Sequence, residues 1–186
     1  MDLVLFGIQG SGKGTQAKKL AQDFGYSIFE TGAELRKIAA SGTELGNTIK
    51  SYIDQGHLAP LTIVMQVVKE AILARPKTQK ILFDGIPRDL DQREEFNAIM
   101  LELGRDFRCV QLTLDDDTAF RRIKGRALAE GRADDADDDA IRRRMQIFKE
   151  RTTPVIEAYR KEGNMIDVDG GRSVEEVYEE LRKAIS

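Results

Sequence analysis

A glycine-rich segment near the N-terminus constrains the fold of this 186-residue chain more than any other feature. The run Gly7–Thr15 (GIQGSGKGT) follows the short apolar stretch Leu3–Phe6 and precedes a helical pattern. A buried strand, a glycine-rich turn and a helix, in this order, wrap backbone N–H groups around phosphate oxygens. Lys13 is placed to reach the terminal phosphates, and Thr15 can offer a hydroxyl near a metal ion. The segment therefore predicts a binding site for a nucleoside triphosphate.

The segment departs from the strict phosphate-loop pattern at one position. Gly14 stands where that pattern has Ser or Thr, and the hydroxyl comes one residue later, at Thr15. The alternative is an ordinary glycine-rich turn between a strand and a helix. The spacing, the lysine and the flanking elements together favour a phosphate site.

Strand-like and helix-like stretches alternate along the rest of the chain. Short apolar stretches bounded by glycine or polar residues predict strands at Leu3–Phe6, Ser27–Glu30, Lys80–Asp84, Arg108–Thr113 and Met165–Val168. Helical patterns fall at Lys13–Phe24, Ala33–Ala40, Glu44–Gln55, Leu61–Ala74, Asp91–Leu103, Asp116–Ala127, Asp137–Lys161 and Ser173–Ile185. This alternation predicts an α/β fold, with a parallel sheet covered by helices on both faces.

Two segments interrupt the alternation. Residues 31–60 are helical in pattern throughout, and Ala127–Ala136 is polar and acidic between two arginine-rich helices. Ligands of doubly wound sheets bind outside the carboxyl ends of the strands. Both insertions are therefore placed to fold over a bound ligand.

Composition excludes several classes of function. The chain has 29 Lys and Arg against 32 Asp and Glu, a net charge of −3, so it has no general basic field for nucleic acid. No apolar run approaches the ~18 residues of a membrane span. The lone Cys109 leaves no internal disulfide or cysteine-based zinc site, and its apolar surroundings predict a buried thiol. The chain starts directly with a strand and not with a signal peptide, so we expect a cytoplasmic protein.

A second candidate site closes the third predicted strand. Asp84 ends the apolar stretch Ile81–Phe83, where it would face the phosphate loop and hold a metal ion through water. Gly85 permits close approach of a ligand, and Arg88 follows a proline that stiffens the turn. The alternative is a plain turn with a solvated arginine.

Arginine is concentrated in the second half of the chain. Arg122 and Arg126 lie four residues apart, on one face of a helix, and Arg132 follows in a loop. Phosphoryl transfer needs fixed positive charge around the moving group, and arginine binds phosphate in a bidentate manner. Ion-paired surface is the alternative, and we expect it for Arg121, Arg142 and Arg144.

Taken together, these motifs make the chain resemble the adenylate kinases, of the kind with a short lid, over essentially all 186 residues. The resemblance is carried by Gly7–Gln16, Thr31–Arg36, Gly56–Pro60, Asp84–Arg88 with Gln92, Arg122 with Arg126, Arg132 with Asp134 and Asp135, Arg143, and Thr153–Pro154. It implies a three-layer α/β/α P-loop kinase domain with a five-stranded parallel sheet, spanning residues 1–186. The core would comprise residues 1–29, 60–125 and 137–186, the lobe that binds the nucleoside monophosphate residues 30–59, and the lid residues 126–136.

The resemblance implies reversible transfer of a phosphoryl group from MgATP to AMP, giving two ADP, by a monomer without zinc. The residues implied for ATP are Gly10, Ser11, Gly12, Lys13, Gly14, Thr15, Arg122, Arg126 and the backbone around Gly171. Those implied for AMP are Thr31, Arg36, His57, Leu58, Ala59, Gly85, Ile86, Pro87, Arg88 and Gln92, with Arg132 and Arg143 bridging the two phosphate groups. The implied catalytic set is Lys13, Arg88, Arg122, Arg126, Arg132 and Arg143. Asp84, through water, and Thr15 are the residues implied for Mg²⁺.

The chain departs from the family pattern at Gln9, Ala33, Ala59 and Ala136, where the family commonly has proline, aspartate, valine and a polar residue. The aspartate missing at Ala33 belongs to the magnesium–water network, so we expect weaker metal affinity. Two other functions stay open. One is a kinase for UMP or CMP, against which Thr31 and Gln92 argue. The other is a nucleotide-binding regulator without turnover, against which the retained lysine and arginines argue.

Overall fold

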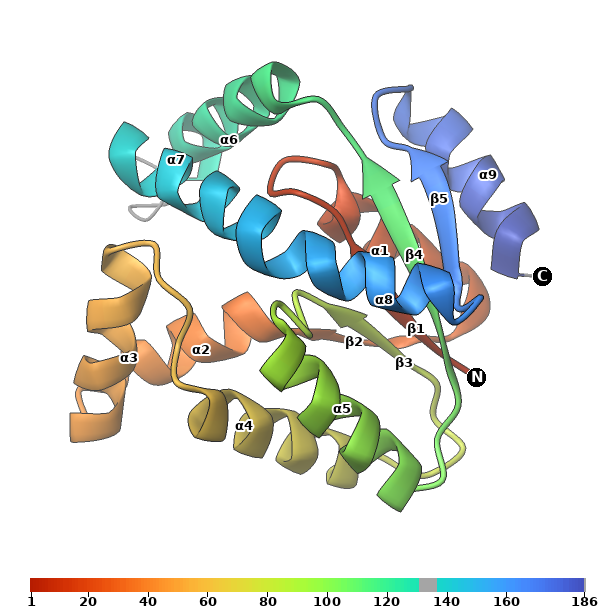
Figure 1. The fold of residues 1–186 in the computed structure, drawn as a ribbon, viewed down its shortest axis with the longest axis horizontal. Coiled ribbons are helices and arrows are strands. Elements are labelled where there is room, and N and C mark those ends of the chain that lie inside the picture. Colours follow the sequence, from red (N-terminus) through yellow and green to blue (C-terminus); the bar gives the residue numbers. More distant parts are fainter. Residues whose placement is uncertain (131–136, 186) are drawn as a thin grey trace.

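The computed structural model describes residues 1–130 and 137–185, which form a sheet of five parallel strands between layers of helices (Figure 1). Each predicted strand is present, with its ends within one residue of the prediction. The strands are β1 (Asp2–Phe6), β2 (Ser27–Glu30), β3 (Ile81–Asp84), β4 (Phe107–Thr113) and β5 (Met165–Asp169). Their order is β2-β3-β1-β4-β5, so β1 lies at the centre and the loop after it lies where the chain switches sides of the sheet. The predicted α/β fold is confirmed.

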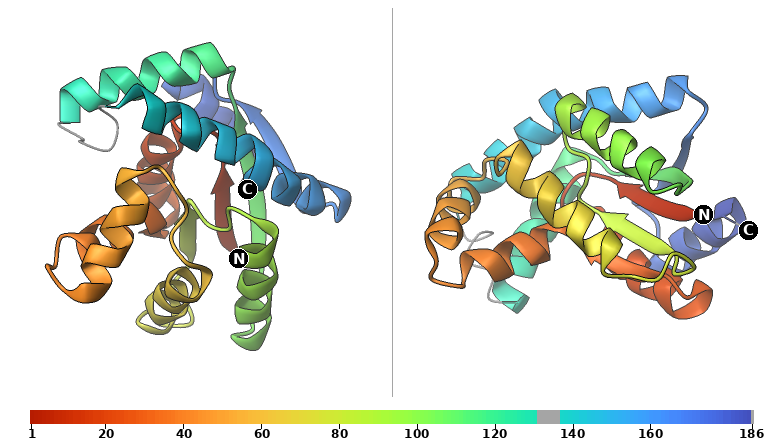
Figure 2. Two further views of the ribbon diagram at one scale, coloured as in Figure 1. Left: turned by 60° about the vertical axis from the view of Figure 1, so that its left-hand side comes forward. Right: turned by 90° about the horizontal axis from the view of Figure 1, so that it is seen from below.

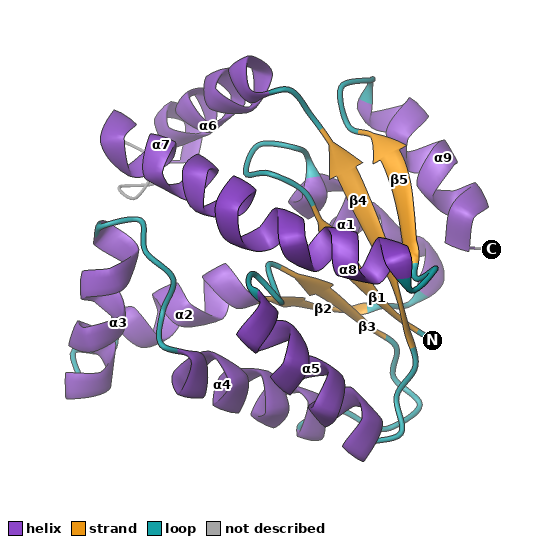
Figure 3. Cartoon of the chain, viewed as in Figure 1, coloured by secondary structure: helices purple, strands orange, loops and turns teal. Residues whose placement is uncertain are grey.

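Side chains that alternate along β1 supply two separate cores. Leu3 and Leu5 pack with α1 (Lys13–Phe24) and α9 (Val174–Ile185). Val4 and Phe6 pack on the other face with α4 (Leu61–Leu73), α5 (Leu90–Glu102) and α8 (Thr153–Lys161). Figure 3 shows the helices on both sides of the strands. Because both faces are covered, all five residues of β1 are buried and the strand is apolar nearly throughout.

The remaining helices form two projections at one end of the molecule. One consists of α2 (Thr31–Ala39) and α3 (Glu44–Asp54), and the other of α6 (Asp116–Glu130) and α7 (Asp138–Ile147). Figures 1 and 2 show both projections at the end away from the two chain termini. They stand at the carboxyl ends of the strands, where the sequence predicted the ligand.

Two of the predicted helices differ from the structure by more than two residues. The segment expected to be one helix, Asp137–Lys161, is divided into α7, a π-helical turn at Phe148–Thr152 and α8. Helix α6 continues to Glu130, three residues past its expected end at Ala127. The division of the chain into core, lobe and lid stays a prediction, since most of the expected lid lies outside the described residues.

Two expectations from composition can be compared with the fold. Cys109 is fully buried in β4, as predicted, and burial raises the pKa of its thiol. Among the residues that the structure describes, no helix combines the length and the apolar character needed to cross a membrane.

Candidate active site

The loop between β1 and α1 has the backbone geometry that the glycine-rich motif predicts. Gly10 and Gly12 have φ angles of 84° and 95°, in the left-handed region that favours glycine. Helix α1 begins at Lys13, so the N–H groups of its first turn are available to an anion. The Lys13 ammonium donates to the carbonyl oxygens of Gly7 (2.7 Å) and Ile8 (3.3 Å), which holds it over the loop.

Two carboxylates face this loop from the ends of neighbouring strands. Glu30 and Asp84 are the last residues of β2 and β3 and pair in register. Burial raises the pKa of Asp84, and the nearby Lys13 opposes that rise. Burial lowers the pKa of Lys13, and the Asp84 carboxylate opposes that fall. The two groups thus support each other's charged form in a region with little water.

A second group of cations lies beside the carboxylates. Arg88 is half-buried, and its Nε donates to the Gly85 carbonyl at 2.9 Å. Burial lowers the pKa of Arg88, and the positive charge of Arg144 lowers it further. Arg36 forms an ion pair with Glu30 at 3.0 Å. Burial and the repulsion between neighbouring positive charges disfavour the charged form of such a group. A bound phosphate would offset this.

These elements line a single cleft of about 670 Å³. The predicted residues that line it are Gly10, Ser11, Gly12, Lys13, Gly14, Thr15, Thr31, Arg36, His57, Leu58, Ala59, Asp84, Gly85, Ile86, Pro87, Arg88, Gln92, Arg122 and Arg126. The phosphate loop and the turn at Arg88 are thus brought to one place, although 75 residues separate Lys13 from Arg88.

One predicted arginine lies outside the cleft and its neighbour lies in it. Arg143 is exposed and donates to the Gln55 carbonyl, just beyond the end of α3, at 2.7 Å. Arg144, which we expected on the ion-paired surface, lines the cleft instead. The buried residues Ile141 and Met145 mark the packed face of α7. At 100° per residue, Arg144 lies about 60° from Ile141 around the helix axis, and Arg143 lies about 160° from it. The position of the apolar residues on α7 could therefore have indicated that Arg144, and not Arg143, faces the cleft.

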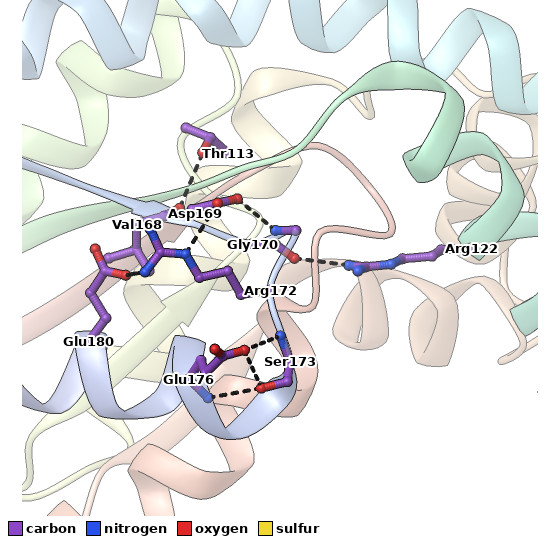
Figure 4. A network of polar contacts seen from close by, with 10 residues as sticks. Thr113, Arg122, Val168, Asp169, Gly170, Arg172, Ser173, Glu176 and Glu180 are labelled. Carbon is purple, nitrogen blue, oxygen red and sulfur yellow. Dashed lines mark hydrogen bonds and ion pairs between the residues drawn. The ribbon is translucent and has the colours of Figure 1, made fainter.

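The loop after β5 carries Gly170 and Arg172, and Arg122 of α6 reaches it (Figure 4). Arg122 donates to the carbonyl oxygens of Gly170 (3.1 Å) and Gly10 (3.4 Å), so it joins this loop to the phosphate loop. Gly170 and Arg172 line the cleft. The predicted Gly171 lies between them, but its N–H donates to Asp169 at 2.9 Å. The loop around Gly171 thus borders the cleft, although Gly171 itself does not line it. Its contact with ATP stays a prediction.

Several buried polar atoms in the cleft wall have no hydrogen-bond partner among the described residues. They are Gln9 Oε1, Ser11 Oγ, Gln16 Oε1 and Thr31 Oγ1. Buried polar atoms are normally satisfied, so a polar ligand in the cleft is the natural partner. The sequence had not singled out Gln16 as a cleft residue. Arg132, Asp134 and Asp135 fall outside the described residues.

The donor groups fit a magnesium ion that arrives with a nucleotide. Magnesium keeps several waters and takes one or two carboxylates together with substrate phosphates. Asp84 and Thr15 both line the cleft and supply a carboxylate and a hydroxyl. Among the described residues, no three His, Cys, Asp or Glu side chains gather into a cage for a metal ion.

A phosphate-binding loop that shares one cleft with a second group of arginines is typical of nucleotide kinases of the P-loop class. Residues 5–164 match the family model described as adenylate kinase. The chain is 34% identical to the adenylate kinase of Bacteroides fragilis, over all of this chain and 98% of that protein. It is 34% identical to that of Thermus thermophilus (98% and 96% covered) and 35% identical to that of Maricaulis maris (95% and 94% covered). The chain belongs to the adenylate kinase family, which confirms the resemblance seen in the sequence.

Proposed function

We propose that this cleft transfers the γ-phosphoryl group of MgATP to AMP, reversibly, giving two ADP. The observation that carries the proposal is the one cleft in which the phosphate loop faces Arg36 and Arg88. Family membership supports AMP as the acceptor over UMP or CMP, and supports an enzyme over a regulator without turnover.

The phosphate loop and α1 form the ATP half of the site. The N–H groups from Gly10 to Thr15 bind the phosphates, and Lys13 carries its charge to the group that moves. Arg122 and Arg126 line the same half. The loop after β5 contacts the adenine through its backbone around Gly170 and Gly171.

The turn after β3 and helix α2 form the AMP half. Arg36 and Arg88 bind the phosphate, and Arg36 exchanges its ion pair with Glu30 for that phosphate. Thr31 and Gln92 contact the adenine, together with the backbone of residues 57–59. The unsatisfied Thr31 hydroxyl supports this placement, because it is buried in the cleft wall.

Catalysis then rests on position and charge. The AMP phosphate is itself the nucleophile, so no side chain needs to act as a general base. Lys13, Arg88 and Arg144 stabilise the charge that develops between donor and acceptor. Arg144 takes the bridging role that the sequence had assigned to Arg143. Arg132 in the lid, residues 126–136, would join it when the lid closes and excludes water.

Magnesium bound with ATP would neutralise charge on the phosphates. Asp84 would hold it through water, and Thr15 is a second candidate ligand. Because Ala33 offers no carboxylate, Asp84 carries more of this role than in family members that have an aspartate there.

We also propose that the protein works as a monomer in the cytoplasm. One chain supplies both halves of the cleft, so the described site needs no residue from a partner. The single cysteine, Cys109, is a free buried thiol, which suits a reducing compartment.

The division of the cleft into two halves can be tested at Arg36. Arg36→Ala should raise KM for AMP by at least about tenfold, since a charge-assisted bond to phosphate is lost, and leave KM for ATP unchanged. Lys37→Ala is the matched control, because Lys37 is the next residue of α2 and is exposed. If Arg36→Ala raised KM for ATP instead, the assignment of the two halves would be wrong.

A further inference from the structure

The main chain of Arg88 is held on both sides by side chains. Its N–H donates to Gln92 Oε1 at 2.9 Å, and its carbonyl oxygen accepts a hydrogen bond from the Thr152 hydroxyl at 2.8 Å. The guanidinium is tied back as well, since Nε donates to the Gly85 carbonyl. The position of the guanidinium is therefore set by the position of its own peptide groups.

The π-helical turn determines where Thr152 lies. Thr152 is the last residue of that turn and is 5% exposed. In a regular α-helix, residues eight apart, such as Arg144 and Thr152, differ by about 80° around the axis. A π turn takes about one extra residue, which brings Thr152 nearly into line with Arg144. Both residues line the cleft.

The same turn makes a second contact with the segment that carries Arg88. Arg151 forms an ion pair with Asp89 at 3.0 Å. Asp89 is buried, and its other oxygen accepts the N–H of Gln92 at 2.8 Å, which caps α5. Two consecutive residues of the π turn thus contact two consecutive residues of the opposite turn.

We propose that Thr152 is a positioning residue for Arg88. Its hydroxyl fixes the Arg88 peptide so that the guanidinium is already directed into the AMP half of the cleft before the phosphate arrives. The Arg151–Asp89 pair holds the two segments in register. The proposal rests on the function proposed above for Arg88 and adds the residue that prepares it.

The test begins with Thr152→Val, which removes the hydroxyl and keeps the shape of the side chain. KM for AMP should rise about tenfold because the Arg88 carbonyl loses its donor, while KM for ATP stays unchanged. Thr152→Ser should restore KM for AMP. Thr153→Val is the matched control, since that hydroxyl donates to the Phe148 carbonyl within the helix, and it should leave KM for AMP unchanged.

A double-mutant cycle tests whether Thr152 acts through Arg88. In an Arg88→Ala background, Thr152→Val should cause no further rise in KM for AMP. A further rise of the same size would show that Thr152 acts independently and would overturn the proposal. So would an unchanged KM in Thr152→Val alone, no rescue by serine, or an equal rise of both KM values with a lower melting temperature.

The cycle also separates this proposal from the proposed function. If Arg88→Ala itself left KM for AMP unchanged, the AMP site assigned to Arg88 would be wrong. If Arg88→Ala raised KM and Thr152→Val did not, the AMP site would stand and the positioning role of Thr152 would be overturned.

Discussion

Lys13, Asp84 and Arg88 carry charges into a part of the molecule where water is scarce. Burial lowers the pKa of Lys13 and of Arg88 and raises that of Asp84, so in each case it favours the neutral form. The opposite charges of Lys13 and Asp84 only partly oppose these shifts. Such an arrangement costs stability and is common where a charged ligand completes the site. We interpret these residues as preorganised for phosphate, because no reorganisation is then needed when the phosphoryl group moves.

The neighbouring arginines of α7 allow a sharp prediction at this scale. Arg144→Ala should lower kcat by at least about a hundredfold, as the loss of one preorganised electrostatic group does. Arg143→Ala should change kcat by less than about threefold, because that side chain lies outside the cleft. Steady-state kinetics with both nucleotides saturating measures this. The reverse order of the two effects would return the bridging role to Arg143.

At the scale of elements, a buried ion pair joins the start of the central strand β1 to the segments beside it. The Asp2 carboxylate accepts hydrogen bonds from Arg105 at 2.7 and 2.8 Å and from the N–H of Ile81 at 2.8 Å. The side chains are 3% and 8% exposed. The pair thus links β1, β3 and the segment before β4 at the amino ends of the strands, opposite the cleft.

Removing one partner of this pair should destabilise the fold and leave the catalytic activity unchanged. Arg105→Ala leaves the buried Asp2 carboxylate without its cation and should lower the free energy of unfolding by about 3 kcal/mol. Arg108→Ala, whose guanidinium reaches the exposed Gly163 carbonyl at 3.0 Å, should cost less than about 1 kcal/mol. Urea denaturation gives both values. Equal costs would mean that the Asp2 pair contributes no more than a surface contact.

Strand β4 also makes a prediction about pH. Burial raises the pKa of Cys109, so the native thiol stays protonated where an ordinary thiol, with a pKa of about 8.5, ionises. The unfolded chain therefore loses this proton first, and stability falls as pH rises above about 8.5. Reaction with a thiol reagent should stay slow from pH 7 to 9 in the native protein and accelerate with pH in urea. Rapid reaction of the native protein would contradict a buried Cys109.

The elements differ in how well the sequence predicted them, for physical reasons. The strands are short apolar runs buried on both faces, and the phosphate loop needs glycine at fixed positions, so both leave a local signal. The π turn at Phe148–Thr152 has no comparable signal, because its wider winding is stabilised by distant contacts such as that of Thr152 with Arg88. The choice between Arg143 and Arg144 likewise depended on which face of α7 is packed.

At the scale of the whole molecule, the two helical projections stand at the same end of the sheet (Figure 2). One follows β2 and contributes Arg36, and the other contributes Arg122, Arg126 and Arg144. The central β1 with its phosphate loop lies between the strands that feed them. This topology explains how residues from distant parts of the chain come to line one cleft.

The central claim is that both phosphate groups react in this one cleft, with AMP as the acceptor. The most direct measurement is a coupled assay of ADP formed from MgATP with AMP, CMP or UMP in turn. We predict two ADP for each AMP consumed, and kcat/KM for AMP at least about a hundredfold above that for CMP or UMP, since a site that hydrogen-bonds one base rejects another strongly. A preference for CMP or UMP, or no ADP formed with any of the three, would contradict the account.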